Sequence, residues 1–288
     1  MTLKADVILR TVGADEYYRH RVQIADEKVL CAAPIEFCIA HSGLIENKVA
    51  YTYNIFGYRN QWNSTSVLGD CAAYLAGGQD SINTPIVETT YYLNSTDVQD
   101  LTAGTGVDRV RIVYLNSVGA QVAMTANLNG KTAVSLGAGF TAIQWMESFH
   151  STTPNRIAAG DITISSINGV ATEATTMEMI LSGGNRSQSL RYTIPAGYKA
   201  HLLDLDSESS GTTMNCKLRA TVFTDDNTIS NTYHFLGVYT LASGSTHNGN
   251  MLYQPIPAGA TVKLSAIPTA KILGSRLTGS LHILIIEM

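Results

Sequence analysis

The sequence predicts an all-β protein made of antiparallel β-sandwich domains, jelly-roll-like in type, behind an N-terminal arm. From Tyr51 onward the chain consists of short runs rich in β-branched and aromatic residues, separated by clusters of Gly, Asn, Ser and Thr. One separator is Asn129-Gly130, the dipeptide favoured in two-residue hairpin turns. Another is the tetrapeptide Ile-Pro-Ala-Gly, which occurs at 194–197 and again at 256–259. These three observations together indicate many short strands joined by tight turns.

The chain divides by composition and periodicity into three expected parts. Residues 1–48 are ordinary in composition, relatively charged and weakly periodic, and we interpret them as an arm or docking segment. We expect a first β-domain over 49–158 and a C-terminal β-sandwich over 159–288. The boundary between them is placed near Pro154, in a Ser- and Thr-rich loop.

The clearest hairpin joins a strand over 109–115 to a second strand over 120–128. Polar and apolar residues alternate in the first run, which is typical of a strand with one buried face. The side chains expected to face inward there are Val110, Ile112 and Tyr114. The Asn129-Gly130 turn then predicts a third strand over 131–136, so that three strands form a meander, and a fourth strand follows over 142–147.

The two Ile-Pro-Ala-Gly segments predict equivalent corners of one β-sandwich. Proline sets φ for the first central position of a turn, and glycine accepts a positive φ, so each segment makes a tight corner that launches a strand. On the last strand, alternation places Leu281, Ile283 and Ile285 on one face. The strands expected in this half are 161–165, 199–206, 217–223, 233–241, 261–267 and 279–286.

Composition excludes several classes of protein. Of the 288 residues, 45% are hydrophobic and 15% are charged, with a formal net charge of −4. Disorder requires low hydrophobicity with high net charge, so we expect a folded chain. Lys and Arg are few and scattered, which disfavours a nucleic-acid surface. No apolar run approaches the 18 residues of a membrane span, and the N-terminus lacks the apolar core of a secretory signal, so we expect neither membrane insertion nor classical secretion.

Cysteine and histidine show no arrangement typical of a chemical site. The four cysteines, Cys31, Cys38, Cys71 and Cys216, contain no C-x-x-C pair, and we expect them to be reduced and mostly buried. None of the seven histidines has another at metal-ligand spacing. Those within expected strands are interpreted as structural or interface residues, namely His201, His234 and His282. We assign no catalytic, cofactor-binding or metal-ligating residue and expect no cofactor.

Two acidic groups leave a calcium site open as an alternative. Asp204, Asp206 and Glu208 would lie on one side of an extended segment, and Asp225 and Asp226 would lie in a loop. Calcium takes six to eight oxygen ligands from such residues. No EF-hand pattern is present, and solvated charges that discourage pairing at a strand edge account for the same residues. We adopt this second interpretation.

Four short motifs follow one another at 102–112, 128–134, 160–164 and 192–197. In their order they resemble a family of tailed-bacteriophage virion structural proteins, whose motifs read TGxRxVxIxxLD, ETVTLNGTTAV, GDIxI and YTVPAGKTAYL. The resemblance covers roughly residues 95–205, and the second motif diverges, since residues 123–130 read Ala-Met-Thr-Ala-Asn-Leu-Asn-Gly. The resemblance implies a virion structural protein without assigning a place on the particle.

We therefore expect a non-enzymatic head decoration or minor capsid protein, made in the host cytoplasm and located in the virion. Its expected partners are other copies of itself in a symmetric homo-oligomer, a trimer, and the major capsid protein or other virion proteins. The abundance of tyrosine, 14 residues, suits a protein that buries surface against partners. Residues 1–48 would dock on a neighbouring subunit and become ordered on assembly.

Two other classes of function remain as alternatives. A tail or head-fibre protein that binds a receptor or glycan would expose aromatic side chains such as Trp62 for stacking on sugars. A polysaccharide-degrading enzyme would place two carboxylates about 5–9.5 Å apart in a cleft.

Overall fold

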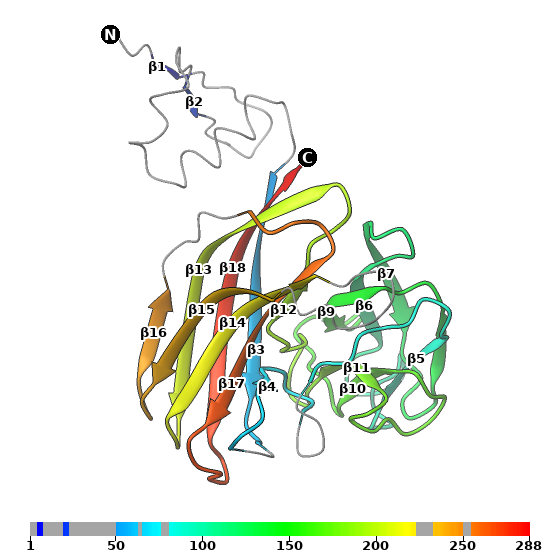
Figure 1. Ribbon diagram of the computed structural model, residues 1–288. Coiled ribbons are helices and arrows are strands. Elements are labelled where there is room, and N and C mark those ends of the chain that lie inside the picture. The colour runs from blue at the N-terminus through cyan, green and yellow to red at the C-terminus, as the bar shows by residue number, and fades with distance from the viewer. Residues whose placement is uncertain are drawn as a thin grey trace.

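The computed structural model describes residues 5–7, 20–22, 50–62, 65–75, 81–222, 233–249 and 255–288 (Figure 1). These residues contain no helix, hence none that could cross a membrane, and all their paired strands run antiparallel. The prediction of an all-β protein is confirmed. The strands are β1 (Ala5–Val7), β2 (His20–Val22), β3 (Ala50–Arg59), β4 (Gly69–Asp70), β5 (Tyr91–Ser95), β6 (Arg109–Leu115), β7 (Gln121–Asn127), β8 (Val134–Gly137), β9 (Ala142–Phe149), β10 (Ile162–Ser165), β11 (Thr176–Ile180), β12 (Arg191–Thr193), β13 (Tyr198–Ser210), β14 (Met214–Val222), β15 (Tyr233–Leu241), β16 (Thr246–Gly249), β17 (Ala260–Pro268) and β18 (Arg276–Glu287).

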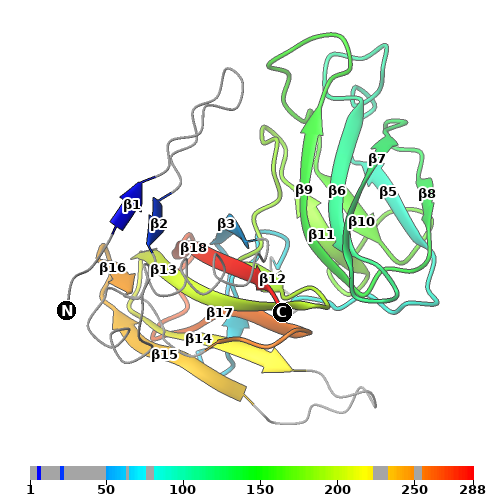
Figure 2. The same cartoon turned by 90° about the horizontal axis from the view of Figure 1, so that it is seen from above.

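The larger sandwich packs two sheets face to face (Figures 1 and 2). One sheet has the order β16-β13-β18-β3, and the other has the order β12-β17-β14-β15 with β4 beside β17. The core between them contains Leu281, Ile283 and Ile285 of β18, which are at most 2% exposed, as their alternation predicts. Burying such an apolar face is the main stabilisation available to a sheet.

The smaller sandwich packs the sheet β11-β10-β5-β8 against the sheet β7-β6-β9. Val110 and Ile112 of β6 are fully buried in its core, as predicted. Tyr114, also expected to face inward, is partly buried there, with its ring centroid 4.4 Å from that of Phe140. Strands β6 to β10 were expected from the sequence, with shifted ends, whereas β5 and β11 were not.

The smaller sandwich is an insertion in the larger one. The chain forms β3 and β4 in the larger sandwich, passes through β5 to β11, and returns at β12. The pairing therefore crosses the division into 49–158 and 159–288: β3 pairs with β18, and β10 pairs with β5. Pro154 lies inside the smaller sandwich, in the loop between β9 and β10. Alternation of polar and apolar residues identifies strands but not the distant strands with which they pair, so it could not reveal that one domain is inserted in the other. Within 1–48, β1 pairs with β2, and the remaining residues lie outside the described part.

Neither the expected three-strand meander nor the expected Asn129-Gly130 hairpin turn forms. Gly130 has φ 57°, but Asn129 does not have the positive φ that an Asn-Gly hairpin turn also requires. The Thr132 amide donates to Asn129 O at 3.0 Å, so the turn is centred on Gly130 and Lys131, and β8 pairs with β5 in the opposite sheet instead of with β7. The Gly130 amide donates to the carbonyl oxygen of Asp100 at 2.9 Å, and the Gly130 carbonyl accepts from the Ser95 amide at 3.0 Å. These bonds hold the turn against β5 and direct the chain across the core.

The two Ile-Pro-Ala-Gly corners lie side by side at one end of the larger sandwich. Gly197 and Gly259 have φ of 80° and 77°, and their corners launch β13 and β17 as predicted. The Ile194 amide donates to Ala260 O, and the Gly259 amide donates to Ile194 O, each at 2.9 Å. The prediction of equivalent corners in one sandwich is confirmed, but the position expected for proline was wrong. The Tyr198 and Ala260 amides donate to Pro195 O and Pro257 O at 3.2 and 3.3 Å, so proline is the first residue of each turn and not its first central residue.

Candidate functional site

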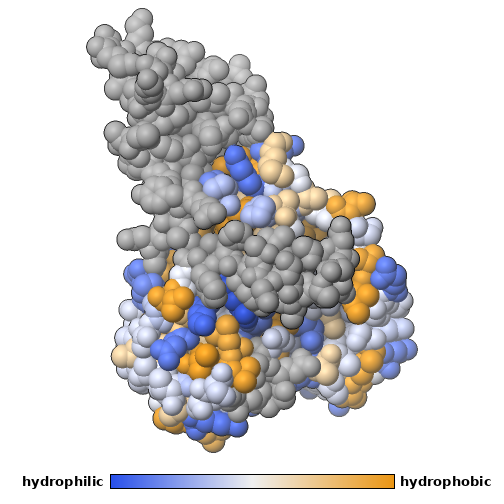
Figure 3. Space-filling view, in the orientation of Figure 1, coloured by the Kyte–Doolittle hydropathy of each residue, from blue (hydrophilic) through white to orange (hydrophobic). Residues whose placement is uncertain are grey.

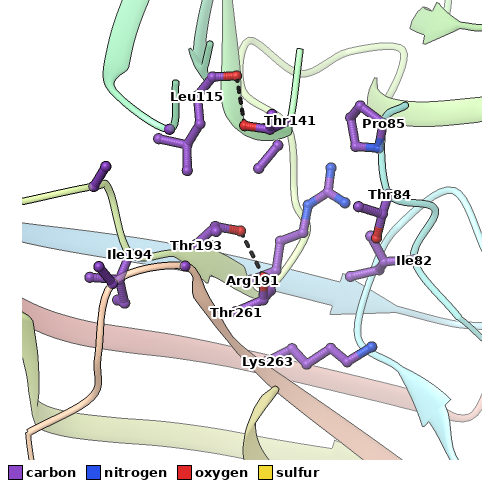
Figure 4. Close-up of a pocket in the computed structure, with 15 residues that line it drawn as sticks. Ile82, Thr84, Pro85, Leu115, Thr141, Arg191, Thr193, Ile194, Thr261 and Lys263 are labelled. Carbon is purple, nitrogen blue, oxygen red and sulfur yellow. Dashed lines mark hydrogen bonds between the residues drawn. The ribbon is translucent and has the colours of Figure 1, made fainter. Parts of the chain in front are cut away.

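A cleft of about 500 Å³ lies where the two sandwiches meet (Figure 4). Its walls come from residues 82–85 on the way to β5, from the near ends of β6 and β9, and from β12, β17 and both corners. Two cationic side chains, Arg191 and Lys263, line it together with threonine hydroxyls and short apolar side chains. The cleft therefore combines two positively charged side chains with a wall of hydroxyl and apolar groups.

Lys263 belongs to a buried cluster around Asp70. The Asp70 carboxylate accepts from Lys263 Nζ and Arg219 Nη2, each at 2.7 Å, and from Ser265 Oγ at 2.6 Å. The Ile82 amide donates to the same carboxylate at 3.0 Å, at the start of the chain toward the smaller sandwich. Burial alone would raise the pKa of Asp70, but Lys263 and Arg219 hold it at about 2. This carboxylate is thus ionised at neutral pH.

Arg191 forms a second buried pair, with Glu178 of β11. Its Nη2 lies 3.2 Å from Glu178 Oε2 and 2.7 Å from Met177 O, and its Nη1 donates to Asn83 O at 2.9 Å. Ser189 Oγ donates to Glu178 Oε1 at 2.7 Å. Burial raises the pKa of Glu178, and Arg191 opposes that shift. Arg191 Nε is also buried, and among the described residues it has no hydrogen-bond partner.

Neutral hydrogen bonds join the sandwiches beside the cleft. The side-chain amide of Gln144 in β9 bonds to both backbone groups of Thr193 in β12. Gln144 Nε2 donates to Thr193 O at 2.5 Å, and Gln144 Oε1 accepts from the Thr193 amide at 2.9 Å. Tyr192 Oη donates to Gln121 Oε1 at 2.8 Å, and Gln121 Nε2 donates to Tyr53 Oη at 3.0 Å. Together with the Glu178–Arg191 pair, these bonds connect strands of both sandwiches directly.

Three of the four motifs that carry the family resemblance converge on one buried residue, Asp100. Its Oδ1 accepts from the Val107 and Ala159 amides at 3.1 and 2.9 Å, and its Oδ2 accepts from the Gly160 amide at 2.9 Å. The Gly130 amide bonds to its backbone carbonyl. Val107 lies in the first motif, Gly130 in the second and Gly160 in the third, with Ala159 directly before it. These three motifs therefore build the packing around Asp100 in the smaller sandwich, while the fourth motif forms a corner at the cleft.

Close backbone approach explains the glycines of these motifs. A Cβ atom on Gly106 would lie 2.1 Å from Asp100 Oδ1, and one on Gly160 would lie 2.5 Å from the Asp97 nitrogen. Neither distance is sterically possible, so both positions require glycine. The glycines serve the packing around Asp100.

Two of the four cysteines and all three histidines expected in strands lie in the described part of the chain. Cys71 and Cys216 are buried free thiols, as predicted, whereas Cys31 and Cys38 lie outside the described residues. His201 is 9% exposed in β13, and burial together with Lys199 lowers its pKa. His282 lies in β18 and His234 in β15, both within strands as expected.

The acidic residues on β13 share a face, as the sequence predicts. Asp204 is half-buried, and Asp206 and Glu208 are exposed, all on the outer side of their sheet. No group of three or more His, Cys, Asp or Glu in the part of the chain that the structure describes could hold a metal ion. Asp225 and Asp226 lie outside that part.

Trp62 is not exposed, contrary to the expectation of a sugar-stacking role. It is 6% exposed, and the Arg59 guanidinium covers its ring at 4.6 Å from the centroid. A different aromatic residue, Phe56 of β3, is 47% exposed on the outer face of the β16-β13-β18-β3 sheet. It borders a shallow depression that also contains Asp206 and Glu208. Packing beneath Arg59 therefore excludes Trp62 as the stacking residue that the glycan-binding alternative would use.

The sequence reasoning did not single out the charged residues at the junction. Asp70, Glu178, Arg191 and Lys263 are far apart in the chain and form no local motif. The available signal was the presence of charge inside otherwise strand-like runs, as in Arg191-Tyr192-Thr193, where a buried charge requires a partner.

Comparisons with known proteins give no family assignment. No family model matches the sequence, and no curated protein matches it. A tandem of CBM22 domains from Paenibacillus barcinonensis Xyn10C matches with a TM-score of 0.24 and 9% identity, over 79% of this chain and 93% of the other. A structure of infectious bursal disease virus, Gx strain, matches with a TM-score of 0.25 and 10% identity, over 83% and 72%. Because these similarities are low, the fold assignment rests on the strands described above.

Proposed function

We propose that this chain is a non-enzymatic structural protein of a tailed-bacteriophage virion, a head decoration or minor capsid protein. The observation that carries the proposal is the placement of the four family-like motifs. Three of them meet at Asp100, and the fourth forms the corner at the junction. The resembling residues thus specify a scaffold, which is the role that a virion building block requires.

The junction supports the same role. The buried Glu178–Arg191 ion pair and the two Gln144–Thr193 hydrogen bonds join the sandwiches, so the smaller sandwich is held to the larger one by more than its two chain connections. Buried, hydrogen-bonded networks of this kind rigidify a structure. A component of a symmetric shell needs such a fixed shape so that every copy makes the same contacts.

We further propose that the chain forms a symmetric homo-oligomer, a trimer. Strand β15 ends its sheet, and no described strand pairs with its outer edge. Val238 on this strand is 65% exposed. Figure 3 shows small apolar clusters scattered among polar residues on the visible face, without one continuous apolar patch. An open strand edge with exposed apolar residues is suited to pairing with another copy.

Binding to particles tests the proposal directly. The full-length purified chain would be mixed with particles assembled from a phage in which its gene is disrupted, and bound protein would be measured after sedimentation. We expect saturable binding at a fixed ratio to the major capsid protein. Binding that never saturates, or none at all, would contradict a place on the head.

A second candidate, glycan binding by a fibre protein, is favoured by the depression beside Phe56. Register places Phe56, Ser280, Asp206 and Asn248 in one row across four strands, on the outer face. Exposed aromatic and planar polar side chains are the groups that recognise sugars. A glycan array with the full chain and Phe56→Ala tests this candidate: loss of a specific signal in the variant would favour it over the decoration role.

A further inference from the structure

The junction cleft has the size and wall composition of a site for a small molecule. Its volume of about 500 Å³ lies within the range of ligand pockets, roughly 300–1,000 Å³. Both sandwiches contribute to it, and junctions between domains are common positions for such sites. Ile82, Pro85 and Leu115 supply apolar surface, and Thr84 lies on the same wall.

Arg191 has a donor that the protein leaves unused. The side chain is 6% exposed, and its Nη atoms bond to Asn83, Met177 and Glu178, but its buried Nε has no partner among the described residues. Buried polar groups are almost always hydrogen-bonded in folded proteins. Figure 4 shows the Arg191 side chain extending through the cleft toward Thr84 and Pro85. An acceptor on a bound ligand would satisfy this donor after a small adjustment of the side chain.

Lys263 supplies a second donor group to the same cleft. Its ammonium group carries three N–H donors, and the bond to Asp70 Oδ2 at 2.7 Å uses one of them. Asp70 also accepts from Arg219 at 2.7 Å, so one carboxylate serves two cations. Lys263 can therefore interact with a further negative charge without giving up Asp70.

We propose that the cleft binds a small organic carboxylate, with its charged end at Arg191 and Lys263 and a short body along the apolar wall. Glu178 and Asp70 offset two of the three positive charges of Arg191, Lys263 and Arg219, so a single negative charge matches the site better than a phosphate dianion. The unused Nε–H of Arg191 can donate one charge-assisted hydrogen bond to a carboxylate oxygen. This inference goes beyond the virion role and does not depend on it.

Calorimetric titration of the full-length protein tests the proposal, with butyrate as the probe and butyramide as its uncharged analogue. Glucuronate and glucose form a second matched pair, which distinguishes a hydroxylated body from an aliphatic one. We expect saturable butyrate or glucuronate binding, and affinity lower by at least about tenfold for the neutral member of the pair, because the ion pair is lost.

Three variants locate the binding. Lys263→Met removes one donor and should weaken carboxylate binding by at least about tenfold. Thr84→Trp should block binding without altering any charge, since the Thr84 side chain makes no hydrogen bond to another described residue and Thr84 is exposed on the cleft wall. Lys271→Met removes an exposed positive charge outside the cleft and should leave affinity unchanged. Denaturation curves show whether each variant is folded.

Any of four results would contradict the proposed carboxylate site. No saturable binding of either carboxylate at tens of millimolar, equal affinity for butyrate and butyramide, or tighter binding of inorganic phosphate than of butyrate would each overturn the proposal. Unchanged butyrate affinity in folded Thr84→Trp would also overturn it, because the ligand would then occupy another place.

Discussion

Replacement of Asp70 by asparagine tests the buried charge cluster that joins β4 to β14, β17 and the start of the insertion. Asp70→Asn keeps the size of the side chain but removes its charge and one of its acceptor positions. Lys263 and Arg219 would then face an amide in a site where Asp70 is 0% exposed. Breaking a buried ion pair by removal of one partner costs about 3–5 kcal/mol.

The pH dependence gives this prediction a second, independent magnitude. The pKa of Asp70 is about 2 in the folded protein, against 3.8 for an unperturbed aspartate side chain, which we take as its value in the unfolded chain. A depressed pKa contributes stability that is present above the unfolded pKa and is lost as the pH falls toward the folded value. At 1.36 kcal/mol per pKa unit, the full contribution is about 2 kcal/mol, and about half of it is lost by pH 3. The variant lacks this contribution.

Denaturant unfolding of the wild type and of Asp70→Asn at pH 7 and pH 3 measures both magnitudes. We expect a difference in the free energy of unfolding of about 3–5 kcal/mol at pH 7. At pH 3 this difference should shrink by about 1 kcal/mol. Glu88→Gln, at an exposed carboxylate, should change little at either pH. A difference below about 1 kcal/mol at pH 7, or one that does not change with pH, would refute the reasoning.

Four further predictions follow from the scaffold. Asp100→Asn should destabilise the protein by about 3 kcal/mol, because an amide nitrogen would face backbone donors, and a loss under about 1 kcal/mol in denaturant unfolding would contradict this. Gln144→Ala should separate the calorimetric unfolding of the two sandwiches into two transitions; a single unshifted transition would show that other contacts suffice. Cys71 and Cys216 should not react with a thiol reagent until the protein unfolds, since burial raises the pKa of both thiols, that of Cys216 to about 12; rapid labelling of the native protein at either position would be inconsistent with this burial. Light scattering after size-exclusion chromatography should give the mass of a trimer, and a monomer at all concentrations would contradict the proposed oligomer.

Local features of the fold were predictable because their causes are local. Alternation identified β6 and the buried face of β18, and the conformational preferences of Pro and Gly identified the corners at 194–197 and 256–259. Each of these features depends on a few neighbouring residues. The same reasoning could not reveal that β3 pairs with β18, because that choice depends on the packing of the whole sandwich.

The candidate site was beyond sequence reasoning for the same reason. Arg191 and Lys263 are brought together by the pairing of β12 with β17, in which Arg191 lies opposite Lys263 itself. Their acidic partners come from β4 and β11, in two different sheets. The glycan-binding alternative would have required Trp62 to be exposed, and the packing of Arg59 against its ring, which sequence does not reveal, buries it.

Quantitative mass spectrometry of purified phage particles tests the proposed virion role most directly. The measured quantity is the copy number of this chain relative to the major capsid protein. A decoration or minor capsid protein should be present at a simple fraction of the capsid copy number. A ratio typical of a tail or fibre protein would favour the adhesion role instead, and absence of the chain from the particles would contradict the structural assignment.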